Sequence, residues 1–303
     1  MTFGATDRQQ GTSGPRSGAR RRAGLAALLA ALLAAPAVTM ARASAVDVVF
    51  DLGREQGPFL GGEDVDLDHV FLSAEFGSTS SKLVFTVPYV QISRTGLVTM
   101  TPEGPAVVGA GGPGRPPWQE SDPDSSEGGL GDVVVMSRNY IMKSGAGNRP
   151  TLTFDVDYKW ATADESKGLG TGENDYSAGF DYIQPIGKRM QILGRATYRF
   201  SGSPAGVDFQ DRLLLRAGFG VMTAHSAWRV HYETVDPLMK EVPLYDATGA
   251  ALAFVEVGNY EVVRGEAVFR NNAGGSWKLW ALAGLNDSSP DIGFGLSLAS
   301  RGL

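Results

Sequence analysis

Hydrophobic and polar residues alternate one by one along much of this chain. Between positions 151 and 160 every even-numbered residue is apolar and every odd-numbered residue is polar. A strict period of two is typical of a β-strand with one apolar and one polar face. The same alternation recurs in segments at 176–182, 189–200, 212–221, 228–233, 264–270, 277–285 and 292–298. The pattern predicts an all-β protein.

Segment length and aromatic placement favour a membrane barrel over a soluble β-sandwich, which also alternates. The segments approach about ten residues, the length that a tilted strand needs to cross a bilayer, whereas ordinary strands average about five or six. Aromatic residues gather at the segment ends, as expected at the two lipid–water boundaries of a barrel. They are Tyr89, Tyr158, Trp160, Tyr182, Tyr198, Phe200, Tyr232 and Trp277.

The connections alternate in length, as the periplasmic turns and outer loops of bacterial barrels do. Short connections at 77–81, 143–149, 186–188, 223–226 and 271–275 alternate with mostly longer ones at 53–64, 94–128, 162–174, 201–208 and 236–258. The last connection, 286–291, is short and departs from the trend. Counting 46–52 as the first strand gives about twelve antiparallel strands, an even number that leaves both termini on the periplasmic side. We therefore predict one transmembrane up-and-down β-barrel over 46–303, with a long loop at 94–128.

The first 45 residues have the features of a secretory signal peptide. Arg16 and the arginines at 20–22 precede an apolar run at 23–38, and small residues at 43–45 fit a signal-peptidase site. The apolar run is shorter than a permanent transmembrane helix needs to cross a hydrocarbon layer of about 30 Å. We expect cleavage near residue 45, with an uncleaved helical anchor as the alternative.

Charge and cysteine content exclude several classes of function. Of 27 basic and 33 acidic residues, removal of 1–45 leaves 21 and 32, so the net charge moves from -6 to -11. An acidic exported chain is a poor nucleic-acid binder. The absence of cysteine removes disulfides, thiol nucleophiles and cysteine-ligated metals, and we expect neither a metal nor a cofactor. The mean hydropathy of -0.09 resembles that of a soluble protein only because alternation averages two opposite faces.

If the apolar face meets lipid, the polar face lines the lumen. Asp155, Asp157 and Asp181 would then lie on one wall and a group of arginines on the next, and this separation of charge would favour polar or anionic solutes. Alternatively, these groups pair across a narrow lumen and plug it. The candidate lumen and selectivity residues are Asp155, Asp157, Asp181, Arg195, Arg199, Arg212, Arg216, Arg229, His231, Glu233, Arg264, Glu266 and Arg270.

The loop at 94–128 offers a second candidate constriction. Its segment 107–114 is apolar, small and flexible enough to fold inward, and its segment 120–127 is acidic. Acidic loop clusters can bind divalent cations that bridge lipopolysaccharide phosphates, but a solvated loop is the simpler interpretation.

Enzymatic barrels form the rival class. The chain has three histidines, His69, His225 and His231. His225 adjoins Ser226 in a predicted periplasmic turn, where a lipase acting on the outer leaflet would not place them. His231 and Glu233 share a face and could form a dyad, but no third orienting group is evident. We therefore predict that the protein is not an enzyme.

Several segments resemble the outer-membrane "transporter" family associated with the meta-pathway of phenol degradation. The resemblance rests on 87–90 (VPYV), 129–132 (GLGD), 163–172 (ADESKGLGTG) leading into 175–177 (DYS), and 284–293 (GLNDSSPDIG). These glycine-rich turn motifs extend from about residue 83 onward and are similar to those of small outer-membrane barrels. One departure is the final Leu303, where such barrels usually end in an aromatic residue.

Together these features predict a Gram-negative outer-membrane channel for passive passage of small solutes. The resemblance implies that the solutes include aromatic or hydrophobic compounds. The expected partners are outer-membrane lipid and lipopolysaccharide, the barrel assembly machinery and the solutes themselves. The alternatives are a plugged structural or adhesive barrel without transport and, less favoured, an outer-membrane hydrolase.

Overall fold

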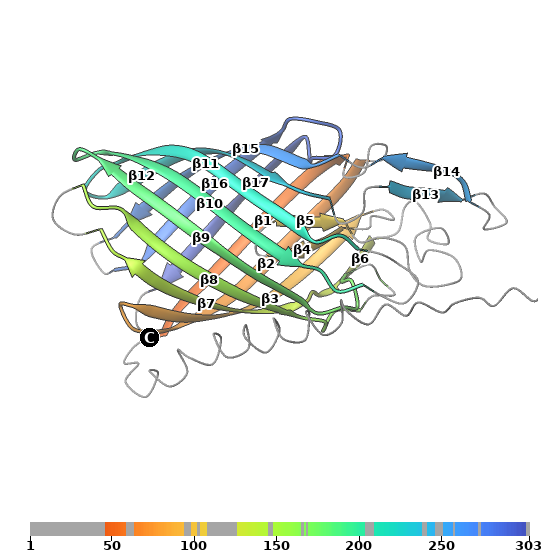
Figure 1. Cartoon of the computed structure of the whole chain (residues 1–303), viewed down its shortest axis with the longest axis horizontal. Helices are drawn as coiled ribbons and strands as arrows, with labels where there is room; N and C mark the ends of the chain where they lie inside the picture. Colours follow the sequence, from red (N-terminus) through yellow and green to blue (C-terminus); the bar gives the residue numbers. More distant parts are fainter. Residues whose placement is uncertain are drawn as a thin grey trace, which may run out of the picture.

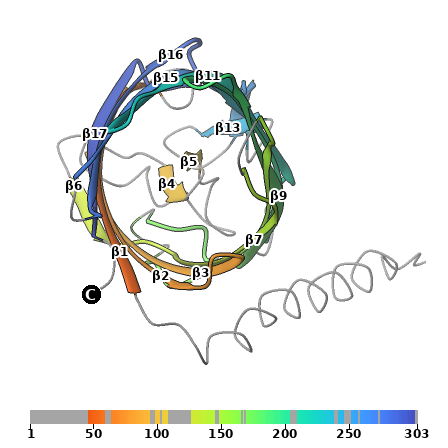
Figure 2. The same cartoon turned by 90° about the vertical axis from the view of Figure 1, so that its left-hand side faces the viewer.

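The chain folds into a closed antiparallel β-barrel with twelve strand positions in its wall, as the sequence predicts (Figures 1 and 2). The computed structural model describes residues 46–58, 64–93, 98–101, 104–107, 126–144, 148–164, 167, 169–203, 209–237, 241–245, 251–256, 258–271 and 274–300. The predicted signal peptide, 1–45, and the final residues 301–303 lie outside these ranges. Among the described residues, no helix is long and apolar enough to span a membrane.

Each wall strand pairs with its neighbour in sequence, and the first strand pairs with the last to close the ring. Two segments, β6 (Ser126–Leu130) and β7, pair one after the other with β3 and share a single wall position. The wall strands are β1 (Val46–Pro58), β2 (Asp64–Gly77), β3 (Ser81–Ser93), β7 (Val133–Met142), β8 (Thr151–Trp160), β9 (Asp175–Ile186), β10 (Met190–Phe200), β11 (Arg212–Met222), β12 (Ser226–Val235), β15 (Tyr260–Arg270), β16 (Ser276–Gly284) and β17 (Ile292–Ser300).

The first strand is longer than the sequence suggests. We predicted a strand at 46–52 followed by a loop at 53–64, but β1 continues to Pro58 and stays in register with β2 throughout. The glycines that suggest a loop have a packing reason instead. A Cβ at Gly53 would come within 2.6 Å of the His69 ring and collide with Trp280, so this wall position has no room for a side chain. Glycine within a strand often marks such a close approach.

Alternation places apolar side chains on the outside of the barrel. The β8 strand matches its predicted bounds, with Trp160 55% exposed outside and Asp157 2% exposed inside. Outward aromatic residues lie near both rims: Tyr89, Trp160, Tyr198 and Tyr232 near the end with long loops, and Tyr182, Trp228, Phe269 and Trp277 near the end with short turns. Such girdles are typical of transmembrane barrels.

The two ends of the barrel differ as predicted. Short turns and the C-terminal side of β17 lie at one end, and the longer connections lie at the other (Figure 1). The loop at 94–128 contains the hairpin β4 (Val98–Thr101) and β5 (Gly104–Val107) as well as β6, and the loop at 236–258 contains the hairpin β13 (Glu241–Tyr245) and β14 (Ala251–Glu256). Viewed along the axis, β4 and β5 lie within the outline of the ring (Figure 2). Most of the apolar and acidic segments of the first loop, 108–114 and 120–125, lies outside the described residues.

Candidate functional site: the barrel lumen

The inner face of the barrel carries nearly all of the predicted lumen residues. All thirteen lie at inward positions of the alternation: Asp155, Asp157, Asp181, Arg195, Arg199, Arg212, Arg216, Arg229, His231, Glu233, Arg264, Glu266 and Arg270. Arg270 is the exposed last residue of β15, so it lies at the rim and not within the lumen. Whether the inward residues select solutes stays a prediction.

Most inward arginines lie beside a carboxylate on a neighbouring strand. Arg216 on β11 contacts Glu233 on β12, with Nε donating at 2.7 Å and Nη2 at 2.5 Å from Oε2. Two further cross-strand pairs are Arg195 with Asp181 at 3.4 Å and Arg229 with Glu266 at 3.8 Å. Arg138 on β7 likewise donates to Asp155 on the neighbouring strand β8, at 3.1 Å.

This pairing differs from the separate acidic and basic walls that the sequence suggests. Opposite charges a few ångströms apart cancel each other's field at longer distance. Because each pair joins two adjacent strands, the inner wall is a series of neutralised pairs, and the transverse field is weaker than we expected. The sequence contains the same residues, but it does not show the register that brings them together.

A stack of side chains crosses the seam where the first and last strands meet. The guanidinium of Arg264 on β15 lies 4.6 Å from the ring centre of Trp280 on β16. The Trp280 ring stacks on His69 of β2 at 5.9 Å, and His69 stacks on Phe71 at 4.8 Å. Trp280 and His69 can approach each other because the strands between β16 and β2 offer glycines at 53 and 295.

Buried charges accompany this stack. Glu55 on β1 is 1% exposed, and its Oε1 lies 3.9 Å from Nη2 of Arg264. Closer to the end with the short turns, Asp51 accepts a hydrogen bond from Ser297 and lies 3.8 Å from Nζ of Lys278. The sequence did not single out Glu55, because this residue falls in the predicted loop at 53–64. Trp280 was missed because only the outward residues of that segment were assigned, namely the odd-numbered positions from Trp277 onward.

The possible catalytic pairs are engaged in structural contacts. The Nε2 atom of His231 lies 4.0 Å from Oε2 of Glu233, beyond hydrogen-bonding distance, and that oxygen is the one that Arg216 contacts. In the turn at 223–226, the Ser226 hydroxyl lies 2.8 Å from the hydroxyl of Thr223. Neither histidine is positioned as the base of a nucleophile.

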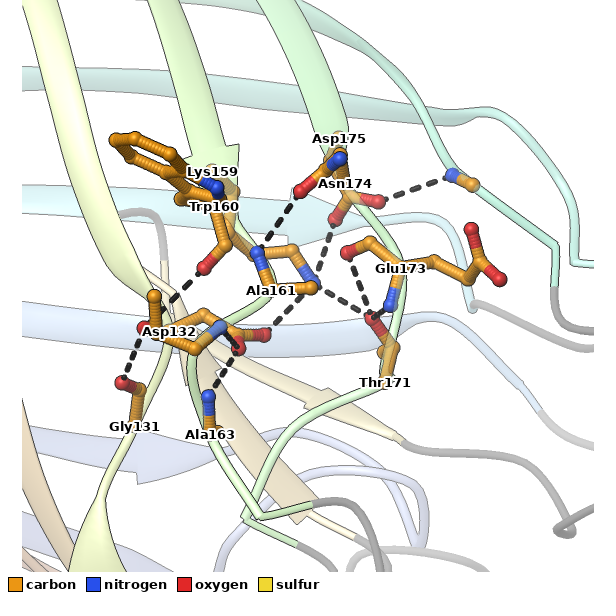
Figure 3. A network of polar contacts seen from close by, with 12 residues as sticks. Gly131, Asp132, Lys159, Trp160, Ala161, Ala163, Thr171, Glu173, Asn174 and Asp175 are labelled. Carbon is orange, nitrogen blue, oxygen red and sulfur yellow. Dashed lines mark hydrogen bonds and ion pairs between the residues drawn. The ribbon is translucent and has the colours of Figure 1, made fainter.

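A fully buried lysine ties three segments together at the end of the lumen that carries the long connections (Figure 3). Lys159, at the end of β8, donates to Thr171 at 2.6 Å and to Asp132 at 3.0 Å, and Asp175 lies 3.2 Å away. Asp132 also accepts from the backbone N–H groups of Thr162 and Ala163, at 3.1 and 3.0 Å. The connection from β8 to β9 is therefore anchored to the inner wall by ionic hydrogen bonds. The alternation places Lys159 on the inner face, but Asp132 and Thr171 lie in connecting segments that carry no such signal.

Two apolar patches also face inward at the end with the long connections. Leu67 on β2 and Val90 and Ile92 on β3 pack with Leu169, which comes from the anchored β8–β9 connection. On the wall formed by β11, β12, β15 and β16, a second patch groups Leu214, Val235, Tyr260, Val262, Trp280 and Leu282. The alternation does not reveal these patches, because apolar residues occupy both faces there.

Comparison with known proteins supports the fold. No family model and no curated protein matches the sequence. Among solved structures, an outer membrane channel from Pseudomonas putida F1 is similar, with a TM-score of 0.61 at 10% identity over 85% of this chain and 95% of that chain. The β-domain of the Bordetella autotransporter Brka matches with a TM-score of 0.41 at 10% identity over 85% and 99%, and a Pseudomonas aeruginosa FadL homologue with 0.35 at 9% identity over 85% and 89%.

At such low identity, the likeness to the Pseudomonas putida channel shows a shared barrel fold. The more specific resemblance to the phenol-degradation family is not confirmed.

Proposed function

We propose that this protein is an outer-membrane channel through which small solutes pass passively, with a preference for apolar or aromatic solutes. The observation that carries the proposal is a closed barrel whose inner wall has two apolar patches at the end with the long connections, beside the Lys159 cluster, and ion pairs further in. We place both termini in the periplasm and assign insertion to the barrel assembly machinery. The long connections would then face outward, next to lipopolysaccharide.

The apolar patches are the basis for the choice of solute. Lumens of water-filled barrels are polar, because apolar side chains gain nothing from facing water. Here Leu214, Val262 and Leu282 are each at most 3% exposed and lie at inward positions. An apolar solute would contact this patch after displacing the side chains that cover it.

The alternative is a plugged barrel without transport. Full burial of Lys159 and Glu233, both charged, favours it, since wide aqueous pores leave such groups wet. The two proposals differ in whether the purified protein conducts ions. In either case we propose no catalytic role for His231.

The test is a planar-bilayer recording of ion current, with propionate and 3-phenylpropionate as probes of equal charge. We expect discrete current steps that the aromatic acid interrupts at concentrations at which propionate does not. Leu282→Ser should weaken this block about tenfold, because a hydroxyl replaces apolar contact surface. Leu279→Ser, on the outward face of the same strand, is the matched control and should block like wild type. Absence of steps would favour the plug, and equal block by both acids would exclude the apolar preference.

A further inference from the structure

The outer face of the barrel has a trough where β15 and β16 pair. In one row across the wall, Phe219, Val230, Gly265, Ala281 and Phe294 lie side by side in register. The row is bulky at both edges and small in the middle. A Cβ at Gly265 would meet nothing within 4 Å, so the space above it is open.

The trough continues toward the periplasmic rim and ends at an aromatic cluster. In the next row Ala267 lies between Trp228 and Leu279. Beyond it, Phe269 stacks on Trp277 at 4.1 Å and meets Trp228 edge-on at 5.7 Å. The resulting groove has a volume of 460 Å³ and an almost wholly apolar lining. Such a volume falls within the range of about 300–1,000 Å³ that is usual for small-molecule sites.

Basic residues lie at the rim near this end of the groove. Arg270 follows Phe269 at the end of β15, and its N–H donates to the carbonyl of His225 at 2.9 Å. Arg189, in the turn before β10, accepts from the N–H of Met222 at the end of β11. Arg270, His225 and Arg189 are all exposed. The described residues of the five turns at this end, within 78–80, 143–150, 187–189, 223–225 and 271–275, include no acidic residue.

We propose that the groove binds one acyl chain of an anionic phospholipid from the periplasmic leaflet, with the phosphate at Arg270 and Arg189. The apolar trough supplies the chain site, and the cationic rim supplies charge complementarity at headgroup depth. The proposal rests on the membrane orientation given above and does not depend on conduction. Failure of the channel proposal would therefore leave it standing.

Native mass spectrometry of the full barrel in detergent tests the site, with phosphatidylglycerol and phosphatidylethanolamine as probes. We expect wild type to retain one phosphatidylglycerol per barrel. Two variants fill the trough, Gly265→Leu and Ala267→Leu, and each should lower the affinity about tenfold. Gly194→Leu is the matched control, because Gly194 on β10 also has an open Cβ position, 4.0 Å from the nearest atom, and should behave as wild type.

The headgroup contact is tested separately. The double variant Arg189→Gln and Arg270→Gln should bind both lipids equally, because only the charge preference is removed. Quenching of tryptophan fluorescence by phosphatidylglycerol with brominated chains gives a second readout, since Trp228 and Trp277 border the groove. The extent of quenching should fall in the trough variants and stay as in wild type in Gly194→Leu. Unchanged retention in both trough variants, or tighter retention of lipopolysaccharide than of phosphatidylglycerol, would overturn the proposal.

Discussion

At the scale of single residues, Lys159 shows how the inner wall holds a buried charge. Its side chain is 1% exposed and is surrounded by Asp132, Asp175 and Thr171. A lysine so placed would cost several kcal/mol if its ammonium group lacked partners. Three oxygen partners from three segments supply that compensation, and in return the ammonium group fixes the mutual position of the segments.

Replacing Lys159 should therefore be costly. In Lys159→Met, the carboxylates of Asp132 and Asp175 remain buried without their shared cation, and we expect the free energy of unfolding to fall by about 3–5 kcal/mol. The measurement is urea unfolding in detergent, with the temperature of the heat-dependent gel shift as a second readout. Lys278→Met is the control, because Lys278 is 33% exposed and lies 3.8 Å from Asp51, and it should lose less than about 1 kcal/mol. Equal losses in both variants would contradict this role of Lys159.

At the scale of elements, the seam between β1 and β17 depends on glycine. The rings of Trp280 and His69 lie against Gly53, so the stack and the strand backbone share the same space. The first and last strands are thus held together by backbone hydrogen bonds and by side chains of β16 and β2 that reach over them.

We expect Gly53→Ala to destabilise the barrel by about 1–3 kcal/mol, because a methyl group is forced into an occupied position. In the background Trp280→Ala the same substitution should cost less, since one of the two obstructing rings is gone. The coupling between the two substitutions, from a double-mutant cycle of unfolding free energies, is the quantity to measure. Gly194→Ala should be close to neutral. Additive effects at 53 and 280 would show that the close approach has no energetic consequence.

The strands differ in how well the sequence predicts them. Residues 151–160 alternate without exception, and β8 has those bounds. The first strand was predicted too short because Gly53 and Gly57 resemble turn residues. The segments of β5 and β6 were missed because they contain glycine or proline and do not alternate, and β4 was missed because its alternation extends over only four residues. Alternation alone predicts which face of the wall each polar residue occupies. It does not predict the ion-pair partners, because the pairing of Lys159 with Asp132 or of Glu55 with Arg264 depends on how distant segments meet in space.

At the scale of the whole molecule, charge is distributed along the barrel axis. The described short turns carry Lys143, Arg149, Lys188 and Arg189 without acidic residues, whereas Asp164, Glu173, Asp211, Asp236 and Asp287 lie in the connections at the opposite end. Among the described connections, the acidic residues therefore gather at the end with the long connections, which is the extracellular mouth in the proposed orientation. A solute entering from outside would meet a negative rim before the neutralised pairs of the lumen.

The ion selectivity of the proposed channel should respond to a change in one of those pairs. Arg216 is 27% exposed while its partner Glu233 is fully buried, so the arginine is the member that reaches the lumen. In Arg216→Glu, two carboxylates replace a neutral pair, and we expect the permeability ratio of cations over anions to rise at least about twofold. The reversal potential under a salt gradient measures this ratio. Arg216→Lys keeps the charge and should retain the wild-type ratio, whereas an unchanged ratio in Arg216→Glu would place Arg216 outside the conduction path. Because the field of a single pair decays within about 10 Å at 0.1 M salt, the change should be larger in dilute than in concentrated electrolyte.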